Sequence, residues 1–130
     1  MCMIAIQKRA GMAVVMPVFL WCLAGCGGGD IEKGTACWYG KGYEGRPTAS
    51  GEIFHATSFT AAHRSLPFGT IVLVKNLENG RTVKVRINDR GPLKGNRIID
   101  LSRAAAEEID LVRAGVAPVR IEVLRRGPKR

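Results

Sequence analysis

One segment, residues 83–92, constrains the fold more than any other part of the sequence. Apolar residues at positions 83, 85 and 87 alternate with Lys84 and Arg86, which is typical of a strand with one buried face. This strand runs directly into an Asn-Asp-Arg-Gly-Pro sequence at 88–92, where glycine and proline predict a tight turn. The sequence therefore predicts that a carboxylate, Asp89, lies where an ordered sheet meets a turn.

The rest of the pattern is also dominated by short strands. Asn79-Gly80 predicts a hairpin between a strand over 70–75 and one over 81–88, since both residues accept positive φ. The first of these strands is almost continuously apolar, so we expect both of its faces to be buried. The remaining expected elements are strands over 35–39, 97–101 and 118–124, one helical turn or short strand over 59–63, and a helix capped by Ser102 that ends at Ile109. Together they predict a small, mostly β barrel.

Between the expected strand over 35–39 and the expected element over 59–63, residues 40–54 form a stretch rich in glycine and turn-forming residues, with no sustained periodicity. This pattern predicts a loop. A loop of this length in so small a domain is usually functional.

The N-terminal residues have the composition of a targeting segment. Lys8 and Arg9 precede an apolar run that is too short for a confident membrane span. The run ends in a Leu-Ala-Gly-Cys tetrad at 23–26, which resembles a bacterial lipobox. The resemblance implies a lipoprotein signal peptide over 1–25, a lipid anchor on Cys26, and a short glycine-rich tether over 26–33. A plain secretory signal with an incidental cysteine is the alternative.

The cysteines and the charge narrow the function classes. The leader contains two of the four cysteines and Cys26 would carry lipid, so only Cys37 remains and we expect no internal disulfide, metal or cofactor. The formal charge of +9 favours polyanions. Export argues against nucleic acid and in favour of cell-wall polymers or phospholipid headgroups. We expect one domain over 34–125 and a basic, solvated tail over 126–130.

Several motifs follow one another from Gly34 to Leu124 and together resemble the rare lipoprotein A family. They are Cys37-Trp38-Tyr39-Gly40, Thr48-Ala49-Ser50-Gly51-Glu52, Ala61-Ala62-His63, Leu66-Pro67-Phe68-Gly69-Thr70, Asn79-Gly80, Asn88-Asp89-Arg90-Gly91-Pro92 and Ile99-Asp100-Leu101-Ser102. The resemblance implies a six-stranded double-psi β-barrel with one or two short helices. It also implies a lipoprotein on the periplasmic face of the outer membrane.

The resemblance also has implications for activity, and this sequence departs from the family pattern in two ways. Some members of the family are lytic transglycosylases that act on peptidoglycan strands without stem peptides. Members typically have serine at the position of Cys37, which is a conservative exchange. Many members also carry a C-terminal peptidoglycan-binding domain that does not occur in this sequence, so septal targeting is not carried over.

The family's functional residues correspond to Glu52, His63 and Asp89. In a lytic transglycosylase the C6 hydroxyl of muramic acid attacks its own anomeric carbon, so one residue can serve as acid and then as base. We predict that Asp89 is this residue. His63 would bind substrate or orient Asp89, and Glu52 would bind sugar hydroxyls or stabilise developing positive charge. A turn cap for Asp89 and a purely structural His63 are the alternatives.

Four further residues are predicted to bind substrate. Trp38 and Tyr39 offer faces on which sugar rings can stack, and we expect one of them to face the core. Arg90 and Ser50 adjoin the predicted site in sequence. We interpret Asp100 as a structural carboxylate near the helix start.

Three other functions compete with a lytic transglycosylase. The first is an expansin-like module that binds glycan without cleaving it. The second is a hydrolase, which would need a second carboxylate. Nucleic-acid binding ranks last, because only the charge supports it and aromatic residues are few. We expect the protein to be a monomer that binds peptidoglycan strands.

Overall fold

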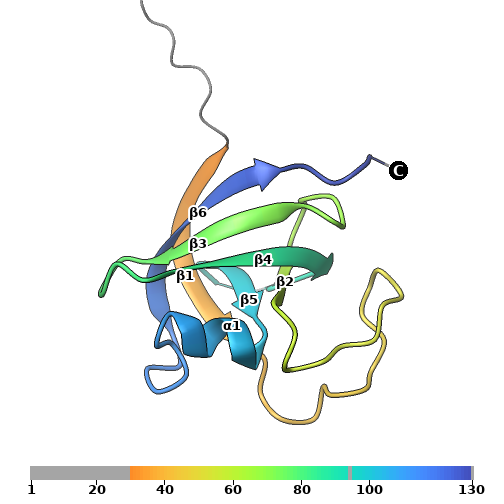
Figure 1. Cartoon of the computed structure of the whole chain (residues 1–130), viewed down its shortest axis with the longest axis horizontal. Helices are drawn as coiled ribbons and strands as arrows, with labels where there is room; N and C mark the ends of the chain where they lie inside the picture. Colours follow the sequence, from red (N-terminus) through yellow and green to blue (C-terminus); the bar gives the residue numbers. More distant parts are fainter. Residues whose placement is uncertain (1–29, 94, 130) are drawn as a thin grey trace, which may run out of the picture.

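The computed structural model describes residues 30–93 and 95–129. Within them the chain forms six strands and one short helix (Figure 1). The elements are β1 (Ile31–Trp38), β2 (Thr60–His63), β3 (Ile71–Asn76), β4 (Thr82–Asp89), β5 (Arg97–Leu101), α1 (Arg103–Glu108) and β6 (Ala117–Arg125). The predicted strand-rich architecture with a short helix is confirmed.

The six strands close into a barrel in the order β1-β5-β2-β4-β3-β6. Two neighbouring pairs, β1 with β5 and β2 with β4, are parallel, and the other four pairs are antiparallel. Strand β2 therefore lies between β4 and β5, which are separated from it in sequence. This placement brings the end of β4 close to β5, and the functional site forms there.

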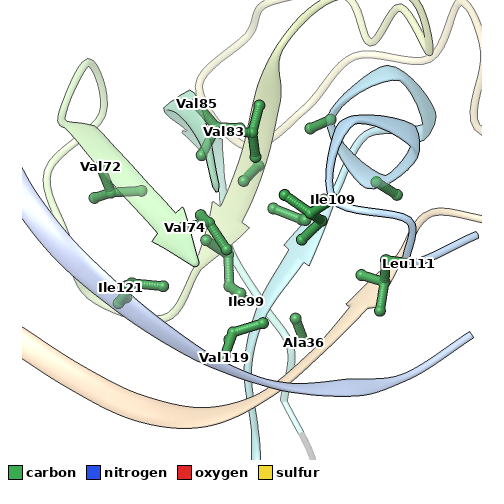
Figure 2. Close-up of a cluster of buried hydrophobic side chains, with 14 of the residues drawn as sticks. Ala36, Val72, Val74, Val83, Val85, Ile99, Ile109, Leu111, Val119 and Ile121 are labelled. Atoms are coloured by element: carbon green, nitrogen blue, oxygen red, sulfur yellow. The ribbon is translucent and has the colours of Figure 1, made fainter. Parts of the chain in front are cut away.

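Alternation of side chains explains how the barrel is filled. Val83, Val85 and Ile87 of β4 are buried, as the sequence predicted. The two valines pair in register with buried valines of β3, and Ile87 pairs with the buried Ala61 of β2. Figure 2 shows the valine and isoleucine side chains of several strands meeting in one cluster. Burying each such side chain contributes roughly 1.5–3 kcal/mol. The hydrophobic effect thus stabilises the barrel that positions the site.

The expectation that the strand over 70–75 is buried on both faces is wrong. In β3, Val72 and Val74 are fully buried, whereas Ile71 and Leu73 are only half-buried and Lys75 is exposed. The reason is that β3 belongs to a barrel with one interior face, and no layer covers its outside completely. An apolar run alone does not distinguish these two situations.

The β3–β4 hairpin is confirmed, but its turn is longer than the two residues predicted. The chain turns over 77–81, and of Asn79 and Gly80 only Gly80 has positive φ, at 77°. The Asn79 side chain instead accepts from the Arg81 backbone N–H at 2.9 Å and donates to the Ile109 carbonyl at 3.0 Å. The turn is thereby tied to the end of α1.

The helix starts as the sequence predicted. The hydroxyl of Ser102 accepts a hydrogen bond from the Ala105 backbone N–H at 3.3 Å, which caps α1, and Ile109 forms the C-terminal cap. Ala105 and Ala106 face the barrel core and are fully buried. The helix is far too short to cross a membrane, and no other helix occurs in the described residues.

Both ends of the domain differ from the expected boundaries. Strand β1 begins at Ile31, so it includes residues that we predicted as tether, before the expected start at Gly34. At the other end, Arg126 forms an ion pair with Asp30, and the Gly127 backbone N–H donates to the Thr70 hydroxyl at 3.0 Å. Residues 126 and 127 are therefore held against the barrel. The predicted signal peptide, the Cys26 anchor and the first tether residues lie outside the described residues.

Candidate functional site

Asp89 ends β4, and its carboxylate accepts three hydrogen bonds. The Tyr39 hydroxyl donates to Oδ2 at 2.7 Å, while the backbone N–H groups of Ala49 and Arg90 donate to Oδ1 at 2.9 Å and 2.8 Å. The donors come from the end of β1, from the long loop after it, and from the turn after β4. Of the three, only the hydrogen bond from the Arg90 N–H is a local turn cap, which was the alternative role considered for Asp89. Three converging donors suit an ionised carboxylate, which only accepts hydrogen bonds.

Tyr39 is fixed by its own aromatic neighbours. Its ring is stacked on Phe54 at 4.6 Å between centroids and meets Tyr43 edge-on at 5.2 Å. Burial raises the pKa of the Tyr39 phenol, and the nearby Asp89 carboxylate acts in the same direction. The phenol therefore remains a hydrogen-bond donor to Asp89. Because Phe54 covers one face of the ring, Tyr39 is better placed to hold Asp89 than to stack on a sugar.

Asp100, which the sequence analysis interpreted as a structural carboxylate near the helix start, lines the same cleft as Asp89. In the sheet, Ala62 of β2 pairs with Asp89 of β4 on one side and with Asp100 of β5 on the other. Two strand spacings therefore separate the two aspartates, roughly 9–10 Å between their Cα atoms. Burial raises the pKa of the Asp100 carboxyl group, Arg97 opposes this, and Asp89 adds to it. Its Oδ1 atom is buried and has no hydrogen-bond partner among the described residues.

The two aspartates share one cleft, which we call the acidic cleft. Its lining includes three aromatic rings, the two carboxylates and two arginines: Trp38, Tyr39, Tyr43, Asp89, Asp100, Arg90 and Arg97. Trp38 also packs partly against the core, as we expected of one of the two neighbouring aromatic residues. Tyr43, which the sequence analysis did not select, is about half exposed, so its ring is accessible to a sugar.

Glu52 lies outside the acidic cleft and fixes the loop beside it. Both guanidinium ends of Arg86 donate to the Glu52 carboxylate, at 3.0 and 2.7 Å, and the Asn88 side chain donates to it at 2.5 Å. The hydrogen bond from Arg86, followed by that from Asn88, lowers the pKa of Glu52. These contacts join the loop to β4, and the same loop supplies the Ala49 N–H to Asp89. Glu52 therefore links this loop to β4, and it can act on Asp89 only through the loop.

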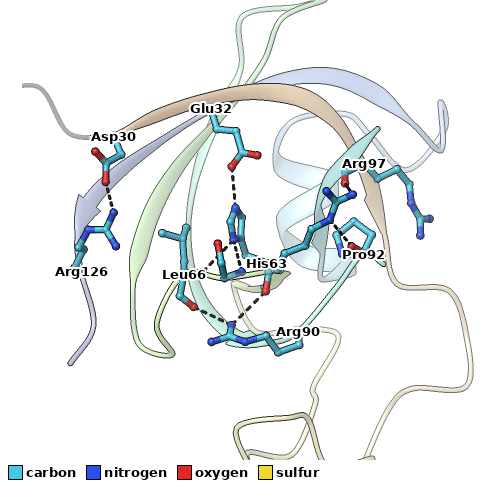
Figure 3. Close-up of polar contacts among 10 residues, drawn as sticks. Asp30, Glu32, His63, Leu66, Arg90, Pro92, Arg97 and Arg126 are labelled. Atoms are coloured by element: carbon cyan, nitrogen blue, oxygen red, sulfur yellow. Dashed lines mark hydrogen bonds and ion pairs between the residues drawn. The ribbon is translucent and has the colours of Figure 1, made fainter. Parts of the chain in front are cut away.

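His63 also acts at a distance from Asp89. Its Nδ1 accepts from the Ser65 and Leu66 backbone N–H groups at 3.1 and 3.2 Å, so the ring proton lies on Nε2 and is donated to Glu32 at 2.9 Å. Figure 3 shows the buried ring between Glu32 and the turn that contacts Arg90. Within the described residues no hydrogen bond joins His63 to Asp89, so any orienting effect of His63 on Asp89 is indirect.

Arg90 connects His63 to the site indirectly. Its Nη1 donates to the carbonyl oxygens of His63 and Leu66 at 3.2 and 2.8 Å (Figure 3). Its guanidinium also lies 4.0 Å from the Phe68 ring centroid. These contacts fix the position of Arg90, which follows Asp89 in the chain. His63 orders the turn, the turn holds Arg90, and the Arg90 backbone N–H contacts Asp89.

Ser50 and Cys37 complete the residues selected from the sequence. Ser50 is exposed in the loop, where its hydroxyl lies 3.0 Å from that of Thr48 and its N–H donates to the Asn88 carbonyl. Cys37 is half-buried, and its sulfur accepts from Arg97 at 3.4 Å, which raises the pKa of the guanidinium. Among the described residues no cluster of three or more His, Cys, Asp or Glu side chains could hold a metal ion.

Comparison with known proteins identifies the family of this chain. Residues 31–121 match the family model described as lytic transglycolase. The chain is 52% identical over 96 residues to the endolytic peptidoglycan transglycosylase RlpA of Campylobacter jejuni, covering 74% of this chain and 35% of that protein. It is 57% identical over 91 residues to the probable endolytic peptidoglycan transglycosylase RlpA of Treponema pallidum, covering 70% and 29%. This chain thus spans about a third of these relatives.

Among solved structures, the apo expansin of Clavibacter michiganensis resembles the chain with a TM-score of 0.59. The sequence identity is 23%, and the match covers 77% of this chain and 53% of the expansin. At this identity the likeness concerns the fold. The predicted six-stranded double-psi β-barrel is confirmed by the closed barrel and by the family match.

Proposed function

Because this chain belongs to the lytic transglycolase family, as its rare lipoprotein A motifs predicted, we propose that it is a peptidoglycan lytic transglycosylase. It would cleave the bond between N-acetylmuramic acid and N-acetylglucosamine and leave 1,6-anhydromuramic ends. The observation that carries this proposal is the pair of unlike carboxylates in the acidic cleft. Relatives of half-identical sequence that are named endolytic peptidoglycan transglycosylases support the choice of polymer.

The two aspartates divide the chemistry, and this revises the role that we predicted for Asp89. Asp100, half-buried and with a raised pKa, donates its proton to the glycosidic oxygen as the bond from that oxygen to the muramic C1 breaks. The C6 hydroxyl then bonds to C1, and the ionised Asp100 accepts the proton that this hydroxyl releases. The enzyme returns to its starting state without a water molecule.

Asp89 stabilises the transition state. Its carboxylate is held by Tyr39, Ala49 and Arg90, so its negative charge stays in place near the positive charge that develops on the sugar ring. Two carboxylates in unlike surroundings, one with a raised pKa and one fixed by three donors, can divide the roles of acid and charge stabiliser. Trp38 and Tyr43 provide apolar faces for the sugars.

The cellular setting is also part of the proposal. The tetrad ending at Cys26 supports a lipid anchor, and with it a place on the periplasmic face of the outer membrane. We further propose that the enzyme prefers strands without stem peptides and works as a monomer. The resemblance to rare lipoprotein A supports the first of these.

The test is product analysis after incubating peptide-free strands with the folded protein. Mass spectrometry should detect 1,6-anhydro ends that increase with time. If the intact protein produces no new ends, the proposal fails.

Two observations favour second candidates. The presence of Asp100 beside Asp89 gives a hydrolase the second carboxylate it needs. Reducing ends in place of anhydro ends would identify it. The likeness to an expansin supports a binding module that does not cleave. That function predicts co-sedimentation with cell walls that persists in Asp89→Asn and Asp100→Asn, with no new chain ends from any of the three proteins.

A further inference from the structure

A second cleft lies on the other side of Arg90, and we call it the cationic cleft. Its lining includes Ser50, Ser65, Pro67, Phe68, Arg90 and Lys129. Both charged residues of this lining are basic, in contrast to the two carboxylates of the acidic cleft. Arg90 lines both clefts, so a polymer chain bound past Asp89 reaches the cationic cleft directly.

Arg90 is preorganised for an anion. Its Nη1 is held by the carbonyl oxygens of His63 and Leu66, and Phe68 supports the plane of the group. A guanidinium carries five N–H donors, so donors remain for a ligand. Because the side chain is already fixed, little conformational entropy is lost on binding.

Lys129 is brought to the cleft by close packing of the C-terminal segment. The Gly127 N–H donates to the Thr70 hydroxyl, and a Cβ at position 127 would lie 2.2 Å from the Phe68 carbonyl oxygen. Only glycine allows this approach. The ion pair between Arg126 and Asp30 anchors the same segment.

Peptidoglycan glycan carries one kind of ionisable group that matches this cleft. The lactyl ether of muramic acid ends in a carboxyl group, which is a free anion when no stem peptide is attached and a neutral amide when one is. We propose that the cationic cleft binds the free lactyl carboxylate through Arg90 and Lys129, with the lactyl methyl group against Pro67 and Phe68. The proposal rests on the proposed function and supplies a physical reason for the preference for stripped strands.

The experiment compares two substrates, one with the lactyl charge and one in which a neutral amide replaces it. Peptide-free strands are used as the free acid or after conversion of the lactyl carboxyl groups to methylamides. The intact protein should have a KM about fivefold lower for the free acid, a factor typical of an exposed ion pair. Lys129→Gln should remove most of this difference without changing kcat. Gly127→Ala, which displaces the same segment, should act in the same direction.

The control is Lys75→Gln, which removes an equal charge from an exposed position on β3. It should behave like the intact protein with both substrates. Equal KM values of the intact protein for acid and amide, or an unchanged preference in Lys129→Gln, would overturn the proposal while leaving the transglycosylase function in place. If no strand is cleaved at all, the proposed transglycosylase function fails. The binding proposal is then tested separately by comparing how much of the free-acid strands and of the methylamide strands co-sediments with Asp100→Asn.

Discussion

At the scale of single residues, Asp89 and Asp100 have different surroundings, and the different roles that we propose for them rest on this. Asp89 accepts three hydrogen bonds, whereas Asp100 has a buried oxygen without a partner among the described residues. The sequence places both at strand ends and does not distinguish them. What separates the aspartates is the donors contributed by β1 and the long loop, which are distant in sequence.

Replacing Asp100 with asparagine should reduce kcat about 100-fold to 10,000-fold, the usual contribution of a general acid. Because its pKa is raised, Asp100 is protonated over a wider pH range, so kcat/KM of the intact protein should fall as pH rises through that pKa. This falling limb should be absent from the residual activity of Asp100→Asn. Asp110→Asn, at an exposed position after the helix, should leave rate and pH profile unchanged.

The Asp100→Asn variant should also be more stable than the intact protein at neutral pH. A carboxyl group whose pKa is raised in the folded state destabilises that state increasingly as pH rises from its unfolded value through its folded value. Urea unfolding of Asp100→Asn should therefore show a gain at pH 7 that decreases toward pH 4. A gain of equal size at both pH values would contradict the assigned burial effect.

Tyr39→Phe tests the support of Asp89. It removes the 2.7 Å hydrogen bond but keeps the ring that stacks on Phe54, so we expect a loss of about 1 kcal/mol in unfolding free energy. Activity should fall less than in Asp89→Asn. Tyr43→Phe, in the same cleft, should be close to the intact protein in both measurements.

At the scale of elements, the long loop between β1 and β2 completes the site. The Glu52 carboxylate joins this loop to Arg86 and Asn88 of β4, and the loop in turn donates to Asp89. In Figure 1 the loop projects from the barrel near the end of β4. A resemblance in sequence groups Glu52 with Asp89, but the two residues line different clefts, and we propose different roles for them.

Glu52→Gln should therefore reduce activity by about tenfold or less, well below the effect of Asp100→Asn. The pair with Arg86 is partly exposed, so its loss should cost at most about 1 kcal/mol of stability. Since the pKa of Glu52 is lowered in the fold, its contribution is present above the unfolded pKa of about 4.3 and is lost as pH falls through the folded value. Urea unfolding from pH 7 to pH 3 measures this, and a 100-fold loss of activity would contradict the positioning role.

Local patterns predicted the elements well and the site only in part. Strand β5, the β3–β4 hairpin and the Ser102 cap depend on neighbouring residues, so the sequence reveals them. The pairing of Ala62 with both Asp89 and Asp100, and the contact of His63 with Glu32, depend on how the barrel closes. No local pattern contains that information.

At the scale of the whole molecule, one closed barrel holds both clefts in place. Strands β2, β4 and β5 supply the paired positions of the site, and their inward side chains form the common core. Damage to the core should therefore lower stability before it alters the chemistry.

Ile99→Ala should test this coupling. Ile99 is fully buried on β5 next to Asp100, so the truncation should cost about 2–5 kcal/mol of unfolding free energy. Leu93→Ala, at a position 85% exposed, should change stability by less than about 0.5 kcal/mol. Urea unfolding measures both variants, and similar losses in the two would contradict the burial pattern.

The central claim is that the muramic C6 hydroxyl, and not water, attacks the anomeric carbon with Asp100 as acid and base. Cleavage of peptide-free strands in water enriched in heavy oxygen tests it most directly. The account predicts 1,6-anhydro ends without label from the intact protein, and a nearly complete loss of these ends in Asp100→Asn. Labelled reducing ends, or undiminished cleavage by Asp100→Asn, would contradict it.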